Sequence, residues 1–106
     1  MQGEALGRPE RPLDPTAGLL PAFAHELREL RRAAGSPKYR SLARIAGYSP
    51  SSLSAAASGW ALPTLALTLA YVGACGGDAA TWERRWHELV AKLDAERRAA
   101  QDRPGM

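Results

Sequence analysis

The sequence "SLARIAGYSPSSLSAAASGWALP" spans residues 41–63 and decides the fold. Its spacing predicts two short helices that are joined by a tight turn. Ala43 is small at the point where the two helices would cross, and Gly47 accepts the positive φ that the turn needs. Leu53, six residues after this glycine, is apolar and would attach the second helix to a core. The stretch is therefore typical of a helix-turn-helix unit.

Start and stop signals on both sides of this unit predict three more helices. A helix typically begins after serine, threonine or aspartate and often has proline in its first turn. Glycine commonly follows the last residue of a helix. Ser36, Ser49 and Asp78 are the predicted N-caps. The predicted helices run from Leu20 or Pro21 to Ala34, from Ser36 to Ala46, from Ser49 to Ser58, from Leu65 to Cys75, and from Asp78 to Ala100.

Composition favours a single all-α domain. The chain has 106 residues, of which 45% are hydrophobic but only 7% are aromatic, and alanine supplies many of the hydrophobic residues. Short, closely packed helices suit this composition better than a sheet does. We expect a five-helix bundle with an extended C-terminal helix, in which residues 1–18 are a flexible N-terminal arm, 19–100 the helix-turn-helix domain and 101–106 a disordered tail.

The charge distribution is compatible with an anionic partner. The net charge is +3, and six basic residues but one acid lie between Arg28 and Arg44. From Ile45 to Trp82, in contrast, the single charged residue is Asp78. No apolar run is long enough to span a bilayer, and the N-terminus lacks the apolar stretch of a signal peptide, so we expect a cytoplasmic protein.

Several further segments, taken together, resemble a known family. These are "LRELRRAAG", "YRSLARIAGYS", "SSLSAAASG", the proline at position 63, and "CGGDAATWERRW". With them, residues 19–89 resemble the xenobiotic-response-element type of helix-turn-helix domain, the phage-repressor-like fold, in its actinobacterial form. The resemblance implies binding to double-stranded DNA, with the third helix in the major groove and the N-terminus of the second on the backbone. It implies a transcriptional regulator, which would be associated with the nucleoid.

Carried over by position, the resemblance assigns two sets of DNA-binding residues. The groove-facing set is Pro50, Ser51, Ser54, Ala55 and Ser58, and the set beside phosphate is Tyr39 and Arg40. From the basic charge of this region we add Arg44, Lys38 and Arg32 as further residues that would neutralise phosphate. Spacing supports the groove-facing set independently, because four of its members recur at i, i+3, i+4 and i+7. The opposite side carries Leu53, Ala56, Ala57 and Trp60. Unlike many members of the family, this chain has no Arg, Lys, Asn or Gln between Ile45 and Leu65, which predicts weak sequence specificity.

The alternative hypothesis keeps the fold and changes the partner. Trp60 either turns inward onto Leu53 or stays outside, where it would be typical of a protein interface. The seam of Trp82, Trp86, Leu89 and Leu93 on the last helix also offers a surface for a partner protein or for a homodimer. On this hypothesis the chain is a degenerate helix-turn-helix domain that acts as a protein–protein adaptor.

Residues that would indicate catalysis are scarce. His25 and His87 are isolated among polar neighbours, and no Ser/His/Asp set is apparent. The single cysteine, Cys75, allows neither an internal disulfide nor a thiolate cluster, and we expect it to be buried. We therefore expect no enzyme activity, catalytic residue, metal site, cofactor or small-molecule substrate.

Overall fold

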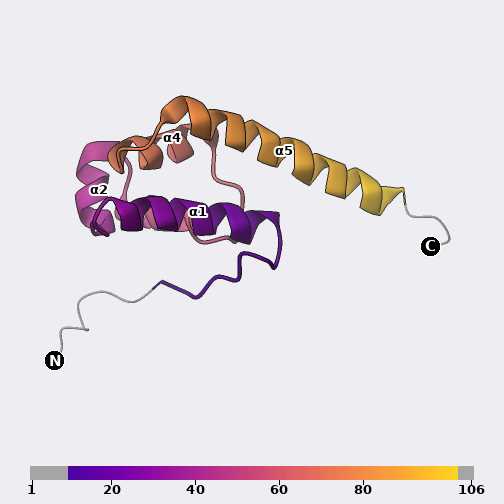
Figure 1. The fold of residues 1–106 in the computed structure, drawn as a ribbon, viewed down its shortest axis with the longest axis horizontal. Coiled ribbons are helices and arrows are strands. Elements are labelled where there is room, and N and C mark those ends of the chain that lie inside the picture. The colour runs from indigo at the N-terminus through magenta and orange to yellow at the C-terminus, as the bar shows by residue number, and fades with distance from the viewer. Residues whose placement is uncertain (1–9, 103–106) are drawn as a thin grey trace.

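The computed structural model describes residues 10–102, and this part of the chain is all-helical, as the composition predicts. The helices are α1 (Leu19–Ala33), α2 (Tyr39–Ala46), α3 (Pro50–Ala56), α4 (Leu65–Ala74) and α5 (Ala79–Gln101) (Figure 1). Residues 1–9, half of the predicted arm, and 103–106, most of the predicted tail, lie outside the described residues.

Side-chain caps begin three of the helices. The Ser49 hydroxyl accepts a hydrogen bond from the amide of Ser52 at 3.1 Å, and the Thr64 hydroxyl accepts one from Leu67 at 3.1 Å. The Asp78 carboxylate accepts from Thr81 at 2.9 Å. Each bond satisfies an amide that has no partner within its own helix. The predicted caps at Ser49 and Asp78 are thus confirmed.

The predicted start of the second helix at Ser36 is wrong. Gly35 and Ser36 have φ values of 97° and 54°, and the amide of Ser36 donates to the carbonyl of Arg31 at 3.0 Å. Ser36 therefore closes the end of α1 rather than opening α2. The N-cap of α2 is Lys38, which makes no side-chain capping bond. The third helix also ends earlier than predicted, at Ala56.

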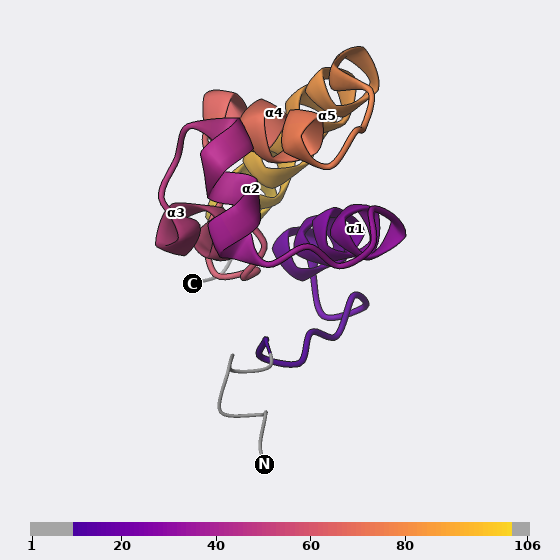
Figure 2. The ribbon, with the colours of Figure 1, turned by 90° about the vertical axis from the view of Figure 1, so that its left-hand side faces the viewer.

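The core lies where α4 meets the other helices. This helix packs against each of the other four, as its nearly continuous apolar sequence suggests (Figure 2). Tyr71 and Val72 from α4 are fully buried together with Leu27 of α1, Leu42 of α2 and Leu53 of α3. Short helices of this kind gain most of their stability from such tertiary packing rather than from their own propensity.

Most of the α5 seam is covered by the chain itself. Trp82 and Leu89 are buried, and Trp82 lies edge-on to Phe23 with ring centroids 5.6 Å apart. Trp86 is partly buried and donates its indole N–H to the carbonyl of Pro63 at 2.9 Å. Leu93 is partly buried at the edge of the core. Beyond it, residues 95–102 are exposed, and α5 extends past the other helices (Figure 1).

Candidate nucleic-acid interface

The helix-turn-helix unit has the geometry that its spacing predicts. Gly47 follows α2 in the left-handed region, at φ 78°, and α3 begins three residues later. Leu53, Ala56 and Ala57 are buried against the bundle. The predicted groove-facing residues lie on the other side, with Pro50, Ser51 and Ala55 exposed, and with Ser54 and Ser58 partly buried. The outer face of α3 is therefore small and uncharged.

The cations predicted to lie near phosphate are exposed. Lys38 precedes α2, Arg40 lies in its first turn and Arg44 in its last. None of these three forms an ion pair with another residue of the described chain. Arg32, at the end of α1, is exposed as well but pairs with Glu29. Lys38, Arg40 and Arg44 therefore present charge to solvent beside α3.

Arg28 and Arg31 do not belong to a solvated face, although their spacing from acids in α1 is typical of one. The Nε of Arg28 donates to the carbonyl of Ala57 at 2.8 Å and lies 3.4 Å from Glu10 Oε2. Arg31 donates to Glu10 Oε1 at 3.0 Å and to the carbonyl of Pro37 at 2.7 Å. Both guanidinium groups thus bond to other parts of the protein. Of the six basic residues between Arg28 and Arg44, these two are therefore not available to an anionic partner.

Tyr39, predicted beside phosphate, has its hydroxyl engaged by the same carboxylate. It donates to Glu10 Oε2 at 2.6 Å, and the hydroxyl of Tyr71 lies 3.5 Å away. The Arg31 guanidinium stacks on the Tyr39 ring, 4.6 Å from its centroid. Burial first, and then the bond to Glu10, raise the pKa of Tyr39 to about 12, and burial also raises the pKa of Tyr71.

These two tyrosines predict a loss of stability at alkaline pH. Because the fold favours the protonated hydroxyls, their contribution is complete below the ordinary pKa of 10 and declines as pH rises through about 12. Urea unfolding followed by circular dichroism across this range should show the free energy of unfolding falling. Tyr39→Phe should make this decline shallower than it is in wild type. Equal slopes for wild type and Tyr39→Phe would contradict this assignment.

Residues 10–18, which we call the arm segment, lie against the bundle although they belong to the predicted flexible arm. Figure 2 shows this segment running beneath α1. The guanidinium carbon of Arg11 lies 4.0 Å from the centroid of the Trp60 ring, and its Nη2 donates to the carbonyl of Ser58. The Nη1 of Arg28 donates to the carbonyl of Arg11 at 2.5 Å. Glu10 and Arg11 were not predicted as site residues, since the segment has no periodicity to indicate contacts.

Trp60 is 72% exposed. Its side chain therefore stays outside the core rather than turning inward onto Leu53. The apolar spacing from Leu53 would place it on the buried side only if α3 continued. The helix ends at Ala56, however, and Gly59 turns the chain at φ 81°. The indole therefore leaves the apolar side and carries Arg11 on one face.

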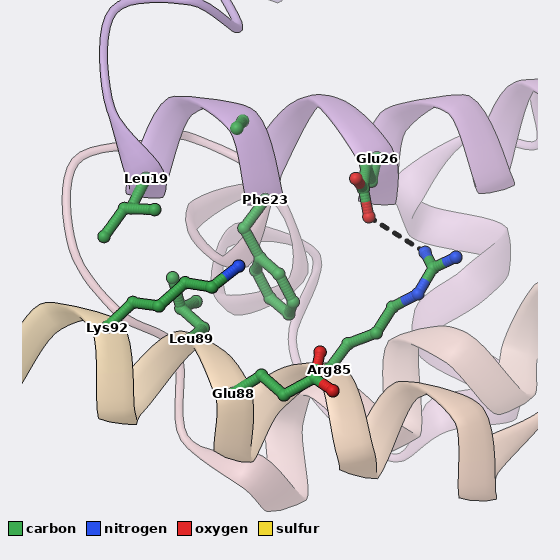
Figure 3. A pocket seen from close by; sticks show the side chains of 8 residues that line it. Leu19, Phe23, Glu26, Arg85, Glu88, Leu89 and Lys92 are labelled. Carbon is green, nitrogen blue, oxygen red and sulfur yellow. Dashed lines mark hydrogen bonds and ion pairs between the residues drawn. The ribbon is translucent and has the colours of Figure 1, made fainter.

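Two of the recesses on the described surface border predicted interface residues. One, of about 250 Å³, lies between α1 and α5, with Phe23 and Leu89 at its floor and an ion pair between Glu26 and Arg85 of 2.8 Å at its rim (Figure 3). The other, of about 210 Å³, lies between the arm segment and α3. Its lining residues are Glu10, Arg11, Arg28, Ser54, Ser58 and Trp60. The second recess thus borders the outer face of α3.

Within residues 10–102, no three His, Cys, Asp or Glu side chains are grouped so that they could hold a metal ion. Over the same residues, none of the helices has the length and apolar character needed to cross a bilayer. Cys75 is buried, as predicted, and burial raises the pKa of its thiol. Comparisons with protein-family models, with curated proteins and with solved structures found no match to this chain.

Proposed function

We propose that this chain is a non-enzymatic protein that binds double-stranded DNA through α2 and α3. The observation that carries the proposal is the small, uncharged outer face of α3 beside the exposed cations Lys38, Arg40 and Arg44, which form no ion pair within residues 10–102. Such cations attract phosphate without regard to sequence, and small side chains allow a helix to approach a groove closely. The combination suits a duplex better than it suits a small ligand.

In the proposed complex α3 lies in the major groove and the start of α2 lies on the backbone. Ser51 and Ser54 would offer hydroxyls, which bond to several bases with little preference, and the methyl group of Ala55 would meet a thymine methyl. Arg40 would contact phosphate. The proposed role is that of a transcriptional regulator of the xenobiotic-response-element type, acting at the nucleoid.

Substituting Arg40 tests the backbone contact. Arg40→Ala should weaken binding to all duplexes alike and reduce the slope of log K against log salt by about 1, because one phosphate contact is lost. The measurement is fluorescence anisotropy with a labelled duplex at several salt concentrations. Arg98→Ala, which removes an exposed arginine near the end of α5, is the matched control. Equal slopes for Arg40→Ala and wild type would exclude Arg40 from the interface.

Selection from a pool of random duplexes tests the function itself. The purified chain is incubated with the pool at low and at moderate salt, and retained duplexes are sequenced. Retention that yields a motif supports a sequence-specific regulator, and retention without a motif supports a binder of the DNA backbone. A chain that retains no duplex at low salt is not a DNA-binding protein.

Exposed apolar side chains favour the second candidate, a protein–protein adaptor. Trp60 and Ile45 are 72% and 70% exposed, and Tyr48 and Leu62 are also exposed. Side chains of this size at a surface are common in interfaces. Because Trp82 is buried, fluorinated tryptophan is preferable to substitution as a probe, with the resonance of Trp60 assigned from Trp60→Phe. A resonance that shifts with a partner protein but not with DNA would favour the adaptor.

A further inference from the structure

The arm segment places a guanidinium group at the C-terminal end of α3. Arg11 stacks on Trp60 at 4.0 Å and donates to the carbonyl of Ser58. Ser54 and Ser58, both in the predicted groove-facing set, line the same recess as Arg11 and Trp60. The long polar side chain that α3 lacks is therefore present beside its outer face, although it comes from a distant part of the sequence.

Internal bonds hold the backbone of the arm segment at this point. The Glu10 carboxylate accepts from the hydroxyl of Tyr39 at 2.6 Å and from Arg31 at 3.0 Å. Arg28 donates to the carbonyl of Arg11 at 2.5 Å and to that of Ala57 at 2.8 Å, so that it joins the arm segment to the end of α3. Residues 10 and 11 are thus attached on two sides, while Arg11 remains exposed.

We propose that Arg11 contacts DNA directly, as a specificity-determining residue that Trp60 and Glu10 position. The inference rests on the proposed DNA-binding function and adds to it a residue outside the helix-turn-helix unit. A guanidinium group has five N–H donors in one plane, and within residues 10–102 that of Arg11 makes one hydrogen bond, to Ser58. Stacking on an indole leaves the edge of that plane available for the paired acceptors of guanine.

The charge of the recess favours a contact between Arg11 and DNA over a purely structural role in which Arg11 only packs against α3. Arg11 and Arg28 outnumber Glu10 among its lining residues, so the recess is positive. The Glu10 carboxylate faces Arg28, Arg31 and Tyr39 rather than solvent, and its side chain is 21% exposed. Trp60 would contribute by restricting the Arg11 side chain before binding. An arginine that is already stacked loses less conformational freedom when it binds DNA.

The test compares five variants with wild type by anisotropy on duplexes taken from the random pool, and Glu96→Gln is the matched control for Glu10→Gln. Arg11→Ala should weaken binding at least about fivefold, and Arg11→Lys should restore only part of the loss, because lysine lacks the planar fork. Arg98→Ala removes the same charge elsewhere and should have little effect. Glu10→Gln should weaken binding although it raises the net charge, because the arm segment loses its attachment. Circular dichroism melting shows that each variant is folded.

The outcomes separate this inference from the proposed function. If wild type binds and Arg11→Ala binds equally well, Arg11 is not in the interface. If Glu10→Gln binds more tightly than a matched Glu96→Gln variant, the arm segment obstructs the interface and the inference is overturned. If wild type binds no duplex, the proposed function fails and this inference fails with it.

Discussion

Replacing Leu42 by alanine is expected to lower the free energy of unfolding by about 2–5 kcal/mol, the range for large-to-small changes in a well-packed core. Leu42 is 1% exposed and is the single fully buried residue of α2, a helix of eight residues. A helix this short is not stable in isolation. Its attachment to the bundle therefore depends on the Leu42 side chain. For a domain whose total stability is on the order of 5–15 kcal/mol, the loss is large.

Urea unfolding at neutral pH, followed by circular dichroism, measures this change. The matched control is Ile45→Ala, one turn along the same helix, where the side chain is 70% exposed. It removes a similar apolar group and should change the free energy of unfolding by only about 0.5 kcal/mol or less. Comparable losses in the two variants would mean that α2 is oriented differently from the structure described above.

Replacing Arg28 by alanine is expected to cost about 2–4 kcal/mol of stability, because it removes donors from partly buried acceptors. Its side chain is 10% exposed and bonds to the carbonyls of Ala57 and Arg11. Without it, both carbonyls lose a donor and Glu10 loses a nearby cation. The variant should also release the arm segment from α3.

The effect of Arg28 is separable from that of a surface ion pair. Arg97, whose side chain is 67% exposed, pairs with Asp94 at 2.8 Å, and Arg97→Ala should cost only about 0–1 kcal/mol. Arg28→Lys should recover little, because one ammonium group cannot reproduce the two fixed directions of the guanidinium bonds. Limited proteolysis reports the arm segment directly, with faster cleavage near residue 11 in Arg28→Ala. Wild-type stability and cleavage in this variant would refute the assignment.

Local chemistry explains why much of the fold could be predicted. The caps at Ser49 and Asp78 each bond to an amide three residues ahead, so both partners lie within one turn of sequence. The turn at Gly47 likewise depends on the φ of one residue. The prediction at Ser36 was wrong because two signals coincide there. The same residue that could cap a new helix instead closes the previous one, and a serine at positive φ is not indicated by sequence.

The candidate site was predictable only along α2 and α3. The exposed residues of α3 follow from helical spacing, as does the exposure of Arg40 in the first turn of α2. The spacing failed at Trp60, where it assumed a helix that had already ended. Nor does helical spacing indicate the carboxylate that pairs with Arg28 and Arg31, because it comes from Glu10 rather than from an acid within α1.

The sequence by itself determined which segments of this protein are helical, where most of them begin, and which faces of α3 and α5 are buried. Capping bonds and apolar periodicity act over three or four residues, so these features depend only on residues that are close in sequence. Only the tertiary structure decided the positions of Glu10, Arg11 and Trp60. Glu10 bonds to Tyr39 across 29 residues, and Arg11 bonds to Ser58 across 47. Such pairs form only after chain reversals bring distant segments together, and no pattern within a short stretch of sequence predicts them.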